Sequence, residues 1–385
     1  ICQPLAIEDY VVQPSPEVSP PKWHLGHTSW LFEEVILKTY QPDFRYFNAE
    51  FCVLFNSYYK AVGAHTLQSE RGNLSRPTVA EIISYRAHID QQMLSLLINT
   101  DLTDEALFLI ETGLHHEQQH QELLYMDIKY ILASNPLTTQ YQSTPLPAAE
   151  APNTTWTSFA EDVVEIGYDG QGFSYDNERP RHNTYIYPFA MSTSLVSNGE
   201  FLAFMQDGGY AKAQYWLSLG WDWVCQQQIQ HPLYWQMHDG LWYEYTLHGL
   251  IPLDLNRPLV HISYFEAYAY AHWKNLRLPT EQELELFLAS TNTSETQQYL
   301  HPNDTQAATG QVWCWTSSQY SPYPRYKAFD GLLNEYNGKF MCNQFVLRGG
   351  CVTTPEQHYR HSYRNFYLPQ QRWMFSGIRL AKDII

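Results

Sequence analysis

The chain contains 385 residues, of which 44% are hydrophobic and 15% aromatic, a globular composition with room for two domains that each have a full core. Its formal net charge of −17 argues against nucleic acid or an anionic membrane surface as a partner, because both attract clustered Lys and Arg. No apolar stretch reaches the roughly 18 residues of a membrane-spanning helix, so we expect no membrane segment.

The start of the chain lacks the basic and apolar regions of a secretory signal peptide. The six cysteines are scattered, and no pair forms a Cys-x-x-Cys motif. Scattered cysteines are more typical of reduced thiols than of a disulfide framework or a structural zinc site. We therefore expect a cytoplasmic protein.

Residues 1–140 are predicted to form a helical domain. Its first helix follows Pro20 and Pro21, because proline fits the first turn of a helix. A second helix begins near Pro77, and another over residues 44–62 would complete a four-helix bundle. Such bundles commonly build metal sites from the inward-facing side chains of facing helices.

The remaining helix of this domain is predicted from Thr103 to about Ala133, with acidic residues in its first turn, where the helix dipole favours them. Its inward stripe at helical spacing consists of Ala106, Leu109, Gly113, His116, His120 and Leu124. His116 and His120 are thus one turn apart on one face, an arrangement that commonly binds a transition metal. They do not form a His-Glu-x-x-His motif, so the pattern gives the zinc-protease interpretation no support.

A third ligand must come from another element. The first predicted helix carries His24 and His27, and packing in a bundle would bring one helix within metal-binding reach of the next. Sequence spacing alone does not choose between these two histidines.

Residues 141–160 are rich in Pro, Thr, Ser and Ala and are predicted to be a linker. Residues 161–385 form the second predicted domain, with many Gly, Trp and Tyr and short β-like runs. We expect short helices near residues 201–204 and 264–273, and strand and turn pieces at 348–350 and 377–380. The fold class is therefore α+β.

Four segments of the helical domain and four of the second domain form a recognisable series. The first four are Trp23-His-Leu-Gly-His, Phe55-Asn-Ser-Tyr-Tyr, Arg71-Gly-Asn-Leu-Ser-Arg-Pro and His116-x-x-x-His120-x-Glu122. The others are Gly208-Gly-Tyr, Arg277-Leu-Pro-Thr-Glu, Val346-Leu-Arg-Gly-Gly and Gly377-Ile-Arg-Leu. In this order they resemble the iron-dependent sulfoxide synthases of ergothioneine biosynthesis. The resemblance implies a DinB-like bundle followed by a formylglycine-generating-enzyme-like module with a C-type-lectin-like fold.

The resemblance also implies a metal site and a reaction. The ligands would be His27, His116 and His120, and the metal Fe(II). The implied reaction joins the sulfur of cysteine, or of γ-glutamylcysteine, to C2 of the imidazole ring of hercynine (Nα-trimethylhistidine). Dioxygen is the co-substrate, and the product is a sulfoxide.

The same resemblance implies roles for residues of the helical domain. Tyr58 and Tyr59 match a branch of the family with a Tyr pair at this place, where an acid diverts the chemistry from plain thiol oxidation. Gln119 matches a residue that hydrogen-bonds the imidazole of hercynine. Arg71 and Arg76 would bind substrate carboxylates through charge-assisted hydrogen bonds.

In the second domain, residues 364–367 match the family segment that contacts hercynine. Asn365 retains its polar residue, and Phe366 and Tyr367 offer aromatic faces that attract a trimethylammonium group. Some members have an acidic residue at the position of Tyr367. Its absence here favours free cysteine over γ-glutamylcysteine.

Other interpretations predict different chemistry. Three-His bundles of the DinB-like type include zinc-dependent thiol transferases, which need no oxygen. The second domain alone is also compatible with a non-catalytic lectin-like binding protein. Nearer alternatives are an ovothiol-type synthase, which joins cysteine to histidine at another ring carbon, and a selenium-using relative.

Overall fold

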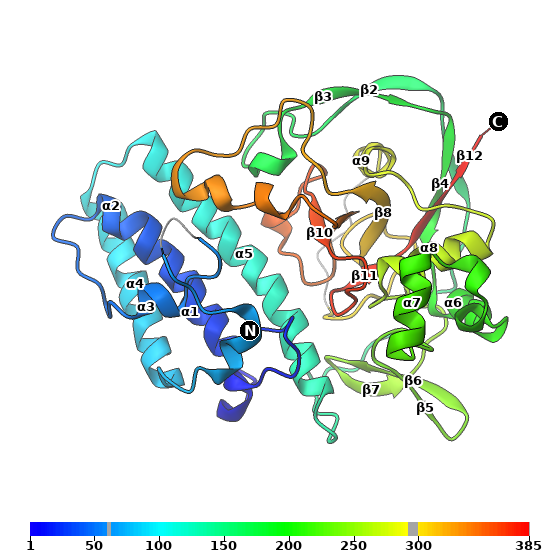
Figure 1. Ribbon diagram of the computed structural model, residues 1–385, viewed down its shortest axis with the longest axis horizontal. Helices are drawn as coiled ribbons and strands as arrows, with labels where there is room; N and C mark the ends of the chain where they lie inside the picture. Colours follow the sequence, from blue (N-terminus) through cyan, green and yellow to red (C-terminus); the bar gives the residue numbers. More distant parts are fainter. Residues whose placement is uncertain (60–62, 292–298, 385) are drawn as a thin grey trace. The chain divides into compact units, whose positions relative to one another are not determined.

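A computed structural model describes residues 1–59, 63–291 and 299–384, and the chain divides into two compact units (Figure 1). Unit 1 comprises Ile1–Tyr141 and Phe329–Glu335, and unit 2 comprises Gln142–Ala328 and Tyr336–Ile385. Within the described ranges, no helix combines the length and the apolar character that crossing a membrane requires.

Unit 1 is built from helices. Its α-helices are α1 (Pro21–Leu31), α2 (Lys38–Tyr40), α3 (Phe51–Leu54), α4 (Val79–Asn99) and α5 (Asp104–Ala133). A π-helical turn (Phe32–Leu37) joins α1 to α2, and 3₁₀ turns cover Ile7–Val11 and Gln68–Asn73. Helix α1 packs against both α4 and α5 (Figure 1).

The helix starts follow from local capping. Proline occupies the first turn of α1, as predicted. Thr78 is the N-cap of α4, and its hydroxyl and the Glu81 carboxylate form a reciprocal capping box. The Thr103 hydroxyl caps α5 by accepting from the backbone of Ala106. The predicted helix from Thr103 to about Ala133 is therefore confirmed.

The predicted helix over residues 44–62 is wrong within the described part of that segment, because only the single turn of α3 is helical there. Residues 60–62 lie outside the described residues. After α3, the Asn56 side chain bonds both the backbone N–H and the carbonyl of Tyr59. This local bonding replaces helical hydrogen bonds, so the four-helix bundle is not formed as predicted.

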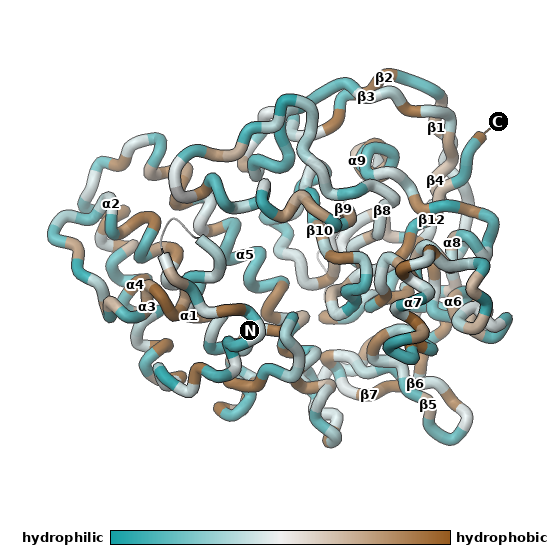
Figure 2. The backbone as a smooth tube through the Cα atoms, in the orientation of Figure 1, coloured by the Kyte–Doolittle hydropathy of each residue, from teal (hydrophilic) through white to brown (hydrophobic). Residues whose placement is uncertain are grey.

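Close packing brings the π-helical turn against the middle of α5. A Cβ on Gly113 would lie 2.8 Å from the ring of Phe32, so only glycine permits this approach without rearrangement. One turn further along α5, the run that contains His116 and His120 is hydrophilic (Figure 2). The helix therefore carries polar side chains into a packed helical interface.

Unit 2 mixes strands and helices. One sheet has the order β1-β4-β12, from Trp156–Phe159, Phe189–Leu195 and Arg379–Asp383. A second has the order β10-β9-β8-β11, from Asn365–Tyr367, Phe345–Arg348, Trp313–Gln319 and Ser376–Gly377. The others are β2-β3 (Asp162–Ile166 and His182–Ile186) and β5-β6-β7 (Trp235–His238, Leu241–Thr246 and Gly249–Pro252).

The helices of unit 2 are α6 (Asn198–Gln206), α7 (Ser218–Gln227), α8 (Tyr264–Trp273) and α9 (Glu281–Ala289). Helices α6, α8 and α9 each begin with a Ser or Thr cap and a Glu three residues into the helix. The two short helices predicted near 201–204 and 264–273 are confirmed as α6 and α8. Strand β1 lies inside the predicted linker 141–160, where it pairs with β4.

Candidate metal centre

Three histidines from two helices converge inside unit 1. His27 comes from α1, and His116 and His120 come from α5. One ring nitrogen of each lies within 4.8 Å of the others, and the ring centroids are 4.5–4.9 Å apart. We call these residues the His triad. The structure thus brings together the three histidines that the family resemblance had implied as ligands.

The ring of His27 is held in a fixed orientation. Its Nδ1 lies 2.7 Å from the Phe55 carbonyl oxygen, which must accept the Nδ1 proton and so leaves the lone pair on Nε2. The indoles of Trp23 and Trp30 stack on the imidazole, at centroid distances of 4.5 and 5.5 Å. Gly26 makes room for the Phe55 ring, because a Cβ there would lie 2.4 Å from it.

Burial keeps the His triad neutral. Desolvation lowers the pKa of His116 from 6.5 to about 3. It also lowers the pKa of His27 and of His120 well below 6.5, and the charge of neighbouring imidazoles adds to the effect. Neutral imidazoles offer lone pairs, so the triad fits a divalent transition metal such as iron or zinc.

The predicted Tyr pair lies next to the indole that flanks His27. Tyr58 and Tyr59 stack on each other at 4.9 Å, and the Tyr59 ring is 5.6 Å from the Trp30 ring. Tyr59 is 1% exposed, whereas Tyr58 is half-buried. The pair is therefore packed into the layer of aromatic rings around the His triad.

The two arginines predicted to bind carboxylates differ in their burial and in their contacts. Arg71 is buried, with its Cζ atom 3.3 Å from the centroid of the Trp23 ring, and Nη1 donates to the Ser19 hydroxyl at 2.8 Å. No carboxylate of the described residues forms an ion pair with it, and its Nε donates to none of their atoms. Arg76 is exposed and donates to the Ser75 carbonyl.

Burial lowers the pKa of Arg71 to about 9, which still leaves the guanidinium charged at neutral pH. A buried cation without a carboxylate partner is costly unless a ligand supplies the negative charge. Arg71 therefore has the properties of an anion-binding residue, and Arg76 does not.

The other predicted contacts divide between the units. Gln119 is half-buried on α5 in unit 1. In unit 2, the Asn365 side chain accepts from the backbone N–H of Phe366, and the Phe366 ring stacks on Tyr320 at 4.0 Å. Tyr367 is buried edge-on against Trp373, at a centroid distance of 5.5 Å.

Two residues beside the His triad were not assigned from the sequence. His24, left open there as a ligand, has its Nδ1 2.9 Å from Nδ1 of His120 and its Nε2 2.9 Å from Oδ2 of Asp127. Asp127 lies seven positions after His120 on α5, and therefore on the same face of the helix. Extending the predicted stripe beyond Leu124 would have identified it.

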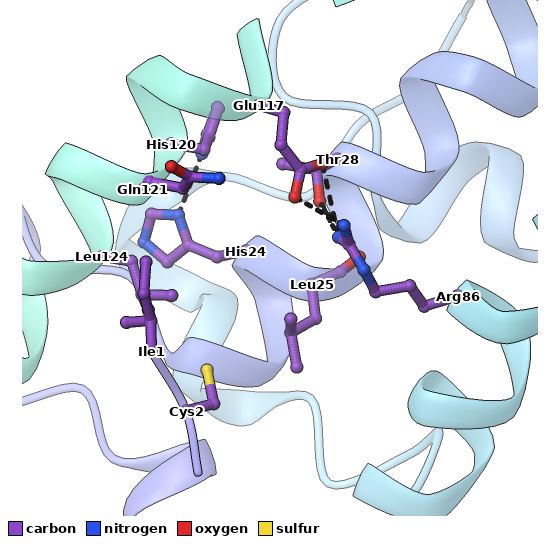
Figure 3. Close-up of a pocket in the computed structure, with 10 residues that line it drawn as sticks. All are labelled: Ile1, Cys2, His24, Leu25, Thr28, Arg86, Glu117, His120, Gln121 and Leu124. Carbon is purple, nitrogen blue, oxygen red and sulfur yellow. Dashed lines mark hydrogen bonds and ion pairs between the residues drawn. The ribbon is translucent and has the colours of Figure 1, made fainter. Parts of the chain in front are cut away.

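A pocket of about 230 Å³ in unit 1 borders this part of the site (Figure 3). Its walls are formed by Ile1, Cys2, His24, Leu25, Thr28, Arg86, Glu117, His120, Gln121 and Leu124. Arg86 and Glu117 form an ion pair across one side, at 2.6 Å. His24 and His120 are thus the two members of the site that line this cavity.

Residues 150–309 and 304–384 match the family described as Sulfatase-modifying factor enzyme 1-like domain. Hercynine oxygenase of Mycobacterium tuberculosis is 30% identical to this chain, over 72% of this chain and 72% of its own length. Hercynine oxygenase of Mycolicibacterium smegmatis is 28% identical, over 97% and 93%. Ergothioneine biosynthesis protein 1 of Schizosaccharomyces pombe is 30% identical over 66% of this chain and 32% of its own length.

The chain belongs to the hercynine oxygenase family. The similarity to the hercynine oxygenase of Mycolicibacterium smegmatis extends through both units, so it includes the segment that carries the His triad. The family-model match lies in unit 2, apart from Phe329–Glu335, and confirms the formylglycine-generating-enzyme-like module predicted there. The DinB-like assignment of residues 1–140 stays a prediction.

Proposed function

We propose that this protein is an Fe(II)- and dioxygen-dependent sulfoxide synthase that joins the sulfur of cysteine to C2 of hercynine. The observation that carries the proposal is the His triad: three desolvated neutral imidazoles in a chain similar to hercynine oxygenases over nearly its whole length. The reaction forms one C–S and one S–O bond. The thiol hydrogen and the C2 hydrogen leave with the second oxygen atom as water, so dioxygen takes up four electrons.

His27, His116 and His120 would hold the metal through neutral ring nitrogens. When bound, Fe(II) supplies electrons to dioxygen and a cationic centre that favours the thiolate form of the thiol. The protein fixes the direction of at least one lone pair, because the Phe55 carbonyl accepts the Nδ1 proton of His27. The surrounding indoles exclude water from the ring of His27.

Arg71 would bind a substrate carboxylate. Its guanidinium is buried and charged, and it lies against Trp23, which in turn stacks on His27. A carboxylate held there would accept charge-assisted hydrogen bonds from the guanidinium, which Asp127 stabilises only through space. Hercynine and cysteine each carry one carboxylate, so a single Arg71 would position one of the two substrates.

Tyr58 or Tyr59 would provide the acid. The proton donor must lie close to the reacting sulfur, because without it the thiol alone is oxidised. Both phenols belong to the aromatic layer next to His27. Gln119, Asn365, Phe366 and Tyr367 are proposed as contacts to hercynine.

The decisive experiment measures oxygen uptake and product together. Protein reconstituted anaerobically with Fe(II) receives hercynine, cysteine and then dioxygen, and the sulfoxide is quantified by mass spectrometry. We expect one dioxygen consumed per sulfoxide formed. Zinc-loaded protein and a reaction with histidine in place of hercynine are the controls. Turnover with zinc, or product formation without oxygen uptake, contradicts the proposal.

A second experiment assigns the acid. Tyr58→Phe and Tyr59→Phe keep the stacked rings but remove one hydroxyl each. The variant that lacks the donor should form less sulfoxide and more sulfinic acid, the product in which the thiol takes up both atoms of dioxygen. Tyr46→Phe is the matched control, since the half-buried Tyr46 donates instead to Glu34. Wild-type product ratios in both variants would show that neither tyrosine is the acid.

A further inference from the structure

His24 is buried against the His triad without belonging to it. It lies one helical turn before His27 on α1 and is 3% exposed. Both ring nitrogens are engaged: Nδ1 faces Nδ1 of His120 at 2.9 Å, and Nε2 faces Oδ2 of Asp127 at 2.9 Å. Figure 3 shows the bond between the two imidazoles from the side of the pocket. With both nitrogens occupied, His24 has no lone pair for a metal.

Ligation of a metal by His120 requires one direction for these hydrogen bonds. An ionised carboxylate only accepts, so Nε2 of His24 donates to Asp127. For Nε2 of His120 to offer its lone pair to a metal, Nδ1 of His120 must carry the proton and donate it to Nδ1 of His24. That leaves the lone pair of His120 on Nε2. The opposite direction would put a proton on Nε2 of His120 and prevent ligation through that atom.

The Asp127 carboxylate is held in place by a further hydrogen bond. Oδ2 of Asp127 also accepts from the backbone N–H of Ser19 at 2.8 Å, and the Ser19 hydroxyl accepts from Arg71 at 2.8 Å. The chain of contacts therefore runs from the buried guanidinium through Ser19 and Asp127 to His24 and His120. A carboxylate that orients a metal-binding histidine is a common outer-shell arrangement, here with a second imidazole inserted.

His120 is the member of the triad that most needs such support. His27 is held between two indoles, and His116 is buried at 2% exposure. His120 is only half-buried and borders the pocket of Figure 3, so packing encloses its ring on fewer sides.

We propose that His24 and Asp127 are positioning residues that fix the tautomer and the ring orientation of His120. The inference rests on the proposed metal centre, of which His120 is a ligand. It predicts that the protein's affinity for Fe(II) depends on two side chains that do not touch the metal. Loss of either should raise the Kd for Fe(II) by about 10–100-fold.

The test is anaerobic competition for Fe(II) between the full-length protein and a chromophoric chelator. Asp127→Asn keeps the shape of the side chain but removes the charge. His24→Phe keeps a ring but removes both hydrogen bonds, whereas His24→Asn retains an acceptor near Nδ1 of His120. We expect affinity to fall in the order wild type, His24→Asn, His24→Phe. Glu117→Gln, which changes the same pocket without touching either imidazole, should bind Fe(II) within about twofold of wild type.

A second readout reports the tautomer. In zinc-loaded protein with ¹⁵N-labelled histidine, the Nδ1 proton of His120 should be protected from exchange, and His24→Phe should abolish that protection. Thermal unfolding of the metal-free variants identifies any that fail to fold, and the two His24 substitutions decide the question if Asp127→Asn is one of them.

The possible results distinguish failure of the proposed metal centre from failure of the positioning role. Wild-type protein that binds no Fe(II) overturns the proposed metal centre and this inference with it. Wild-type protein that binds Fe(II) while Asp127→Asn and His24→Phe bind it equally well overturns only the positioning role. Reduced affinity in the folded variants, with loss of the protected proton, supports it.

Discussion

Each unit buries a cluster of polar side chains, and the two clusters differ in how their charges are matched. In unit 2, Arg348 and Arg364 both bind Glu281, at 2.9 Å, and Arg348 also binds Glu285 at 2.8 Å. The arginines are fully buried, and opposite charges face each other. In unit 1, the His triad is neutral, and the buried Arg71 guanidinium forms no ion pair with a carboxylate of the described residues.

This difference distinguishes a structural cluster in unit 2 from a candidate ligand-binding site in unit 1. Burial alone would raise the pKa of Glu281, but the guanidinium groups of Arg364 and Arg348 outweigh it and hold the pKa below 4.5. Each guanidinium of that cluster has a carboxylate partner within the protein. For the His triad, burial opposes the charged form, so the imidazoles stay neutral and their lone pairs can bind a ligand. Substitutions should therefore affect stability in unit 2 and ligand binding in unit 1.

The largest effect is expected from the His triad. His116→Leu should abolish sulfoxide formation and weaken Fe(II) binding by more than the roughly 10–100-fold typical of outer-shell residues. The free energy of unfolding of the metal-free protein should be unchanged or higher, because an apolar side chain replaces a desolvated imidazole. Chelator competition and chemical denaturation measure the two quantities. His88→Leu on α4 is the control, and a large loss of metal-free stability in His116→Leu alone would show that the triad is structural.

Glu281→Gln should show the opposite pattern. It leaves two buried guanidinium groups without their shared carboxylate, so the free energy of unfolding should fall by about 3–5 kcal/mol. Fe(II) affinity of the folded protein should not change. Glu165→Gln, which removes an exposed pair with Arg181, should cost less than about 1 kcal/mol. Equal costs for the two substitutions would contradict the view that the buried cluster is the scaffold.

Arg71→Met tests whether the unmatched cation binds substrate. Loss of a charge-assisted hydrogen bond should raise KM for one of the two substrates by about 10–100-fold. Metal-free stability should not fall, because the variant no longer buries an unpaired charge. Arg76→Met is the control and should change KM by less than about twofold, since Arg76 is exposed. Equal effects of the two variants would show that Arg71 is not the anion-binding residue.

The sequence predicts α5 well because its signals are local. A Thr cap, acidic residues in the first turn and a continuous stripe all agree on the same segment, and the structure places the helix at Asp104–Ala133. The same stripe puts His116 and His120 on one face. Local patterns thus account for two members of the triad and for the helix that carries them.

The rest depends on tertiary contacts that no local pattern contains. The choice between His24 and His27 is made by the Phe55 carbonyl on one ring and Asp127 on the other, and both partners are distant in sequence. The helix predicted over 44–62 fails for a related reason: the chain leaves α3 at Phe55, and the Phe55 carbonyl accepts from His27 instead. In unit 2, β12 pairs with β4 across nearly two hundred residues of chain.

The smallest expected effect is the pH dependence of the stability that Glu281 and its two arginine partners contribute. Because the folded-state pKa of Glu281 is depressed, its contribution to stability is full above about pH 4.5 and is lost as the pH falls through the lower folded-state pKa. In that window the unfolded chain binds one more proton, so Glu281 contributes a slope of at most about 1.4 kcal/mol per pH unit. Glu281→Gln should remove this slope and Glu165→Gln should retain it, as measured by denaturation at several pH values below 5. If both variants kept the wild-type slope, the guanidinium groups would not hold Glu281 ionised, and the charges in unit 2 would be less well matched than the geometry indicates.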